Sequence, residues 1–128
     1  MAAIPSSRER VPARRVVVTG LDVVTPIGVG HDAFWKAALE ALTRYLATEL
    51  AARGITVNTV SAGAVETDVW QAIPDGAAAL SAIRARTPGG ALVTPEDVAE
   101  VVFFLASPGA QAIQGQVVTV DGGYSLLA

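Results

Sequence analysis

Lys36 has the clearest potential for chemistry, because it is the chain's one lysine and stands near the start of a long helical pattern. A lysine ammonium can hold a ribose or lower the pKa of a neighbouring acid, but only beside a suitable partner. By residue statistics alone, a solvated surface lysine is the more frequent case. Lys36 is therefore a candidate site residue whose role depends on its surroundings.

A second candidate site lies in the segment ITVNTVSAGAVETD, residues 55–68. A strand ends there in Ser61, Ala62 and Gly63 before the chain turns out of the sheet. Ligands of open α/β sheets bind at the carboxyl ends of strands, although an ordinary exit from strand to loop fits the same pattern. The acidic residues nearby have no spacing that pairs them as acid and base: Glu66, Asp68 and Asp75.

A glycine pattern precedes the long helix, where Gly28, Gly30 and Ala33 match G-x-G-x-x-A. Small residues there could let backbone N–H groups approach a dinucleotide pyrophosphate. However, the gap from strand to glycine is too long, and no acidic residue follows about 20 positions later at a strand end. We therefore favour a plain loop.

Composition excludes several classes of function. The sequence has no cysteine, so thiol catalysis is excluded, and the absence of disulfides fits a cytoplasmic location. It has one histidine, His31, so no metal site is expected. Nine scattered basic residues and a net charge of -3 do not predict a surface that binds nucleic acid. No apolar run is long enough to span a membrane, so we expect no membrane partner. Charged residues make up only 16%, which predicts apolar surface covered by self-association.

The elements that must position these residues follow from residue periodicity. Residues 1–13 predict a flexible arm, and residues 14–128 a single α/β domain. Strands are expected at 15–20, with a possible extension to Val24, and at 55–63 and 115–123. A helix is expected over 32–53, because apolar residues recur every three or four positions: Leu39, Leu42, Leu46 and Leu50.

Two further helices complete the expected pattern, an Ala-rich one over 76–86 and one that begins at Thr94. Thr94 is the predicted N-cap, Pro95 the first helical residue and Asp97 the partner in a capping box. The predicted buried stripe of this helix is Val98, Val101, Val102 and Leu105. The alternation of strands and helices predicts a parallel sheet with flanking helices.

Residues 36–128 carry several motifs together, including ITVNTVSAGAVETD, RTPGGALVTPEDVAEVVFFLAS and GQVVTVDGG. They resemble the C-terminal part of a short-chain dehydrogenase/reductase, nearer to enoyl- than to 3-oxoacyl-acyl-carrier-protein reductases, though both stay open. The resemblance implies a partial Rossmann-like fold, NADH or NADPH as cofactor, and fatty-acid or polyketide synthesis. It also implies acyl carrier protein or an acyl thioester as partner, and dimers or tetramers.

The same resemblance assigns roles to residues. Lys36 falls on the lysine of a catalytic Tyr and Lys pair, where it holds the cofactor ribose. Gly63, Val65 and Thr67 would contact the nicotinamide end of the cofactor, and residues 64–86 would form the substrate-binding loop.

Other parts of a reductase site are missing. The tyrosine of the pair should precede Lys36 by four or seven residues, but Asp32 and Val29 stand there. The glycine-rich phosphate loop and the residue that selects the ribose are also absent. We therefore expect weak cofactor binding, and no activity from the chain alone.

Residues 14–39, RRVVVTGLDVVTPIGVGHDAFWKAAL, resemble the opening of a β-ketoacyl-acyl-carrier-protein synthase, apart from Asp22 where that family usually has glycine. The two resemblances overlap at KAAL, which suggests a chimera with a synthase-like part at 14–35 and a reductase-like part at 36–128. Condensation chemistry is excluded, because it needs a cysteine and two histidines.

Three functions are compatible with the sequence. The first is a reductase that is active only if another chain supplies the tyrosine and the phosphate loop. The second is a non-catalytic oligomerisation or nucleotide-binding module, and the third is an acyl-carrier-protein-binding remnant of a ketosynthase.

Overall fold

The structure is a computed structural model that describes residues 16–23 and 31–127, with side chains from Lys36 onward. The expected arm at 1–13 and the pattern of Gly28 and Gly30 lie outside the described residues. Within the described residues, no helix is long and apolar enough to cross a membrane.

Three parallel strands form one sheet in the order β1 (Val16–Val23), β2 (Thr56–Ala62) and β3 (Val117–Val120). The predicted parallel sheet is therefore confirmed, although β3 is shorter than the expected 115–123. Gly115 and Gly122 have positive φ angles of 67° and 62°, which take the chain out of extended conformation at both ends of β3. The register between β1 and β2 shifts between Val18 and Leu21.

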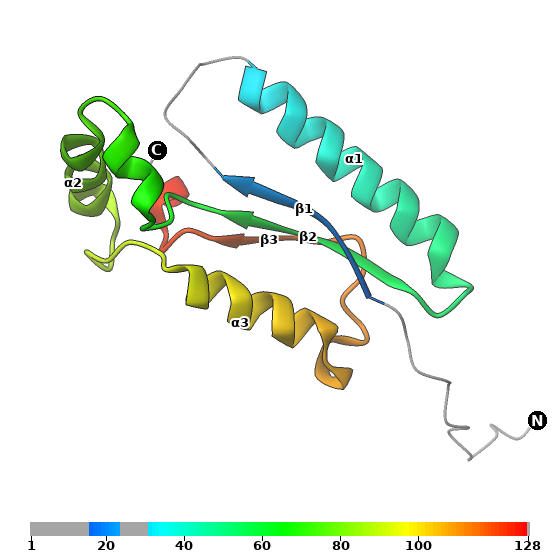
Figure 1. The fold of residues 1–128 in the computed structure, drawn as a ribbon. Helices are drawn as coiled ribbons and strands as arrows, with labels where there is room; N and C mark the ends of the chain where they lie inside the picture. The colour runs from blue at the N-terminus through cyan, green and yellow to red at the C-terminus, as the bar shows by residue number, and fades with distance from the viewer. Residues whose placement is uncertain (1–15, 24–30, 128) are drawn as a thin grey trace, which may run out of the picture.

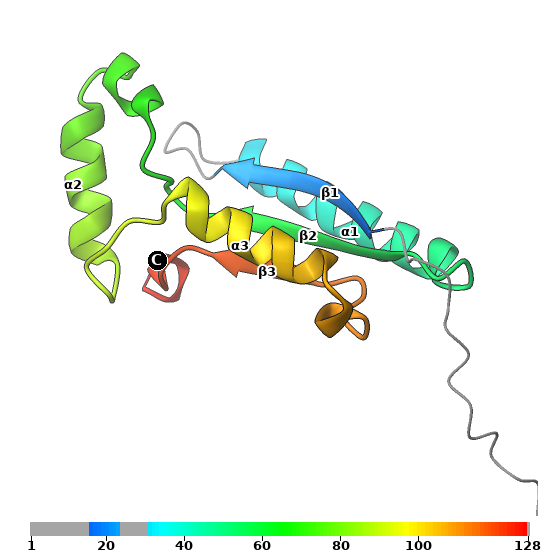
Figure 2. The same ribbon diagram turned by 60° about the horizontal axis from the view of Figure 1, so that its bottom comes forward.

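The helices α1 (His31–Ala51) and α3 (Pro95–Ala106) cover opposite faces of the sheet (Figures 1 and 2). The short helix η1 (Asp68–Ala72) and the helix α2 (Gly76–Arg86) lie beyond the carboxyl ends of the strands. Two further single turns, η2 (Pro108–Ala110) and η3 (Tyr124–Leu126), flank β3 in the sequence. The region beyond the strand ends is therefore walled by α2 and by the C-terminal segment.

The start of α3 is fixed locally by a capping box, as predicted. The Asp97 N–H donates to Thr94 Oγ1 at 3.2 Å, and the Thr94 N–H donates to Asp97 Oδ2 at 2.8 Å. Val98 and Leu105 are buried, and Val101 and Val102 pack against the same core, so the predicted stripe is confirmed.

The face by which α1 packs agrees with the predicted leucine pattern only in part, because Leu39, Leu46 and Leu50 are half-buried and Leu42 is exposed. Leu42 is 46% exposed, whereas Thr43 and Ala47 are buried, and no other residue of α1 from Lys36 onward is. The Thr43 hydroxyl donates to the Leu39 carbonyl at 2.7 Å and shares a hydrogen bond with the Thr59 hydroxyl of β2. Small side chains at this contact let the helix approach the strand closely, and Leu42 is turned toward solvent.

The hydrophobic core lies between the sheet and α3. All seven residues of β2 are buried, as expected for the central strand of a parallel sheet covered on both faces. The core cluster draws residues from β2, from α3 and from the loops beside them: Val60, Ala62, Val93, Val98, Leu105 and Ala110.

Candidate functional site

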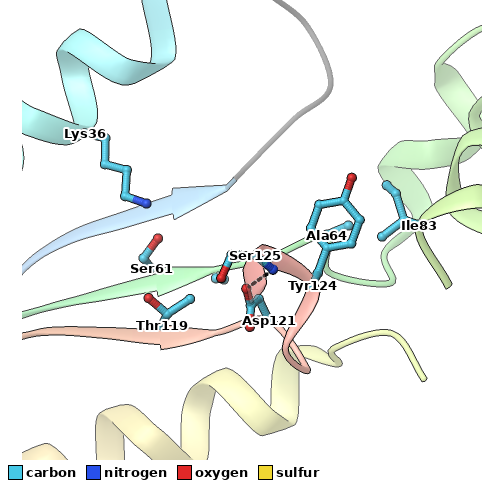
Figure 3. A pocket seen from close by; sticks show the side chains of 10 residues that line it. Lys36, Ser61, Ala64, Ile83, Thr119, Asp121, Tyr124 and Ser125 are labelled. Carbon is cyan, nitrogen blue, oxygen red and sulfur yellow. Dashed lines mark hydrogen bonds between the residues drawn. The ribbon is translucent and has the colours of Figure 1, made fainter. Parts of the chain in front are cut away.

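A cavity of about 260 Å³ opens at the carboxyl ends of β2 and β3 (Figure 3). Side chains from α1, α2, both strands and the C-terminal turn line it: Lys36, Ser61, Ala62, Gly63, Ala64, Ile83, Thr119, Asp121, Tyr124 and Ser125. Its position is where ligands bind in open α/β sheets. The polar side chains of this lining therefore lie at the carboxyl ends of the strands, where a ligand is expected.

Lys36 contributes the one cationic side chain of this lining. It is solvent-exposed, and neither of the ion pairs found between described residues involves it. Figure 3 shows its side chain extending from α1 toward Ser61. The ammonium can therefore donate hydrogen bonds to a ligand in the cavity.

Asp121 has a structural role in the turn after β3. Its Oδ1 accepts from the Gly123 N–H at 2.8 Å, and its Oδ2 accepts from the Ser125 N–H at 2.9 Å. Burial acts to raise the pKa of Asp121, but hydrogen bonds from Ser125 and Gly123 outweigh it and hold the pKa below its ordinary value. The Asp121 carboxylate therefore fixes the turn that places Tyr124 and Ser125 on the cavity wall.

This carboxylate should make stability depend on pH. Because the pKa of Asp121 is lowered on folding, its contribution is present above the unfolded pKa of about 3.9 and is lost as pH falls through the folded value. In urea unfolding, Asp121→Asn should be less stable than the wild type at pH 7, with a smaller gap at pH 3. A gap that does not change with pH would contradict the assignment.

Two arginines in the last turn of α2 hold the outer wall of the cavity. The Arg86 guanidinium lies 5.1 Å from the centre of the Tyr124 ring and donates to the Tyr124 hydroxyl and the Leu127 carbonyl, each at 3.3 Å. Arg84 pairs with Glu66 at 3.3 Å. Through these contacts, α2 is tied both to the C-terminal segment and to the loop after β2.

The structure brings only some of the predicted site residues together. Lys36 and Gly63 line the same cavity. Val65 is half-buried, forms a parallel bridge with Val93, and is not among the residues that line that cavity. Thr67 lines a separate cavity of about 270 Å³, together with Glu66, Asp68, Trp70, Gln71, Ala77 and Leu80.

Several cavity residues were missed by the sequence reasoning. Tyr124 matches no catalytic motif by its distance from Lys36, yet both residues line one cavity. The motif VDGG at the end of the strand predicted over 115–123 could have identified it. The carboxyl ends of neighbouring parallel strands lie together, so residues that follow this strand are expected near those that follow the strand ending at Gly63. This signal places residues 121–125 beside Gly63.

The donors of the cavity suit part of a nicotinamide nucleotide. The Lys36 ammonium and the hydroxyls of Ser61 and Thr119 can bond to ribose hydroxyls or to a carboxamide. The volume of about 260 Å³ is below the roughly 300–1,000 Å³ of complete small-molecule sites, so a whole dinucleotide would extend outside it. Among the described residues, no cluster of three or more His, Cys, Asp or Glu could hold a metal ion.

Comparison with known proteins gives consistent sequence matches. The family described as enoyl-(acyl carrier protein) reductase matches residues 16–125. The 3-oxoacyl-acyl-carrier-protein reductase of Vibrio harveyi is 40% identical over 113 residues, which is 87% of this chain and 46% of the relative. The dehydrogenase OXI1 of Cochliobolus heterostrophus is 42% identical over 96 residues, 72% of this chain and 41% of that protein.

Solved structures agree with these matches. A putative NAD(P)-dependent gluconate 5-dehydrogenase from Beutenbergia cavernae, with bound NADP, is 36% identical with a TM-score of 0.71, and the match covers 88% of this chain and 46% of that one. A protein from Thermus thermophilus gives the same TM-score at 34% identity and covers 83% and 47%. The chain spans about half the length of the relatives it matches.

Proposed function

The chain belongs to the enoyl-(acyl carrier protein) reductase group of the short-chain dehydrogenase/reductase family, and from this premise we propose that it supplies the nicotinamide and substrate side of an NAD(P)H-dependent reductase site. The observation that carries the proposal is the joint presence of Lys36 and Gly63 on one cavity at the carboxyl ends of β2 and β3. The names of the curated relatives favour a 3-oxoacyl thioester of acyl carrier protein as substrate, and the description of the matching family favours an enoyl thioester.

Different residues of the cavity would bind different parts of the cofactor and substrate. When bound, the nicotinamide supplies the hydride. Lys36 holds the ribose hydroxyls, and Ser61 and Thr119 orient polar groups at the floor of the cavity. The proton donor is the missing part, because Val29 and Asp32 stand where the family places its tyrosine. We therefore propose that the isolated chain binds the cofactor weakly and does not turn over.

Lys36→Met is expected to weaken NADPH binding about tenfold, because it removes the charge-assisted hydrogen bonds to the ribose. Titration calorimetry with NADPH, and in parallel with NADH, measures this against the wild type. Arg53→Met is the matched control, since Arg53 is an exposed cation outside the cavity. Equal losses in both variants, or no loss in Lys36→Met, would contradict the role of Lys36.

A turnover assay tests the other half of the proposal. NADPH oxidation by the pure chain, with acetoacetyl or crotonyl thioesters, should stay at the background rate. Turnover that exceeds background and depends on Lys36 would show that the chain is active alone.

A second function, a non-catalytic assembly module, is favoured by exposed apolar residues. Phe103 and Phe104 of α3 are 74% and 50% exposed, and Leu126 and Leu127 near the C-terminus are 81% and 61% exposed. Such residues on a small domain are typical of a covered interface. We propose that the chain forms a homo-oligomer, a dimer or tetramer, through α3.

Phe103→Glu is expected to shift the chain to a smaller assembly, because it places a charge in this interface. Light scattering during size-exclusion chromatography measures the change. Val69→Glu is the control, since Val69 is an exposed apolar residue on η1, away from α3. An unchanged mass in Phe103→Glu would exclude α3 as the interface.

The ketosynthase-derived alternative depends on residues 14–39. The family match begins at residue 16 and includes β1, which favours a reductase origin for this strand. Binding of acyl carrier protein that survives changes in 64–86 but fails after changes in 14–34 would favour the alternative instead.

A further inference from the structure

The cavity at the carboxyl ends of β2 and β3 has a polar end and an apolar end. Figure 3 shows Lys36, Ser61 and Thr119 on one side of it. Ile83 and the ring of Tyr124 lie on the other side. The apolar end therefore suits a part of a ligand that has neither charge nor hydrogen-bonding groups, such as a hydrocarbon chain.

The Tyr124 ring is fixed at the apolar end from two directions. The Tyr124 N–H donates to the Asp121 carbonyl at 3.1 Å, within the turn that the Asp121 carboxylate also holds. The Arg86 guanidinium lies 5.1 Å from the centre of the ring and donates to the Tyr124 hydroxyl at 3.3 Å. Arg86 is exposed and does not itself line the cavity. It therefore supports the ring from outside the cavity.

The turn that carries Tyr124 also packs closely on the segment after α2. Gly122 has a φ of 62°, and a Cβ there would lie 2.8 Å from the Thr87 side chain. A Cβ on Gly123 would lie 3.2 Å from the side chain of Pro88. The turn is therefore seated against this segment, which limits how far the Tyr124 ring can shift.

We propose that Tyr124, held by Arg86, limits the length of the acyl chain that the cavity accepts. This rests on the proposed function, in which the cofactor ribose occupies the end at Lys36. An acyl chain whose thioester lies beside the cofactor extends toward Ile83 and meets the Tyr124 ring. Because part of the cofactor shares the volume of about 260 Å³, only a short chain fits in front of the ring. Tyr124 is then the specificity-determining residue, and Arg86 is a positioning residue.

Titration calorimetry with the butanoyl and dodecanoyl thioesters of coenzyme A tests this limit, because the two probes differ only in chain length. Both are kept below the concentration at which they form micelles. Tyr124→Ala should raise the affinity for the dodecanoyl probe about tenfold relative to the butanoyl probe, since each further buried methylene contributes about fourfold. Tyr124→Phe keeps the ring and should keep the wild-type ratio of the two affinities.

Arg86→Met should change this ratio in the same direction by about threefold, because it removes the cation–π contact that holds the ring. Arg84→Met is the matched control. It removes the same charge from the same turn of α2, but its partner Glu66 does not line this cavity, so the ratio should not change. Arg86→Met in a Tyr124→Ala background should add less than about twofold, since Arg86 acts only through the ring.

Each outcome decides the proposal. An unchanged ratio in folded Tyr124→Ala, equal shifts in Arg84→Met and Arg86→Met, or no binding of either probe would overturn it. Weaker NADPH binding by Tyr124→Ala at an unchanged ratio would assign the ring to the cofactor instead. If Tyr124→Ala does not fold, Arg86→Met decides, because it changes an exposed side chain. A shifted ratio together with NADPH binding that does not depend on Lys36 would leave the length limit standing and contradict only the proposed function of Lys36.

Discussion

Gln114→Leu is expected to lower the free energy of unfolding by about 2–4 kcal/mol, because it removes three hydrogen bonds to the backbone at once. The Gln114 Oε1 accepts from the Val57 N–H at 2.7 Å. Its Nε2 donates to the Ala47 carbonyl at 2.7 Å and to the Ile55 carbonyl at 3.1 Å. Val57 is fully buried, so leucine would leave its N–H without the acceptor it now has. The loss is large against a typical total stability of about 5–15 kcal/mol.

Gln116→Leu is the matched control for this change. Gln116 is exposed, and its side chain makes a hydrogen bond at 2.9 Å to the carbonyl of Gln114. Urea unfolding should show Gln116→Leu within about 1 kcal/mol of the wild type. Gln114→Glu should not restore stability at pH 7, because it keeps an acceptor for Val57 but sets a carboxylate oxygen against the Ala47 and Ile55 carbonyls, which now accept from Nε2. Equal stability of the two leucine variants would show that Gln114 does not hold α1, β2 and the loop before β3 together.

Features determined by neighbouring residues were predictable from the sequence. The cap of α3 needs only Thr94, Pro95 and Asp97, and its hydrogen bonds join residues three positions apart. The helix α2 begins and ends at the predicted residues, 76 and 86, because Gly, Pro and Thr stop it locally. The parallel sheet followed from the alternation of strands and helices.

Features that depend on contacts between distant segments were not predictable in the same way. The residues that Gln114 joins lie 57 to 67 positions away in the sequence. Leu42 fits a helical stripe, but the close approach of α1 to β2 favours the smaller Thr43 and Ala47 at the contact. A periodic pattern gives the apolar positions of a helix, whereas the size of the gap to the sheet selects which of them are buried.

The candidate site shows the same division. Lys36 and Gly63 were identified by residue type and by resemblance, and the fold places them on one cavity. Tyr124 and Ile83 join them only because α2 and the C-terminal turn both lie beyond the strand ends. A sequence motif finds residues at fixed spacings along the chain. Tyr124 and Ile83 are far from Lys36 in the sequence, and only the fold brings them to the same cavity.

Gly76→Ala is expected to displace α2 and thereby to change the wall of the cavity at Ile83. A Cβ at position 76 would lie 2.0 Å from the Trp70 carbonyl oxygen, which is far inside van der Waals contact. The clash is with backbone, so a rotamer change cannot relieve it. Trp70 itself is 4% exposed, and its Nε1 donates to the Val65 carbonyl at 2.8 Å. Overpacking of this kind costs about 1–3 kcal/mol.

The matched control is Gly89→Ala, because a Cβ there would meet nothing within 4 Å. Its stability should stay within about 1 kcal/mol of the wild type. Tryptophan fluorescence in a Trp35→Phe background should report the displacement, since Trp70 is then the one remaining tryptophan. If Gly76→Ala leaves both the fluorescence and the NADPH affinity unchanged, the position of α2 does not control the cavity. If it changes the fluorescence and weakens binding while Gly89→Ala does neither, then the packing of α2 against η1 sets the shape of the site.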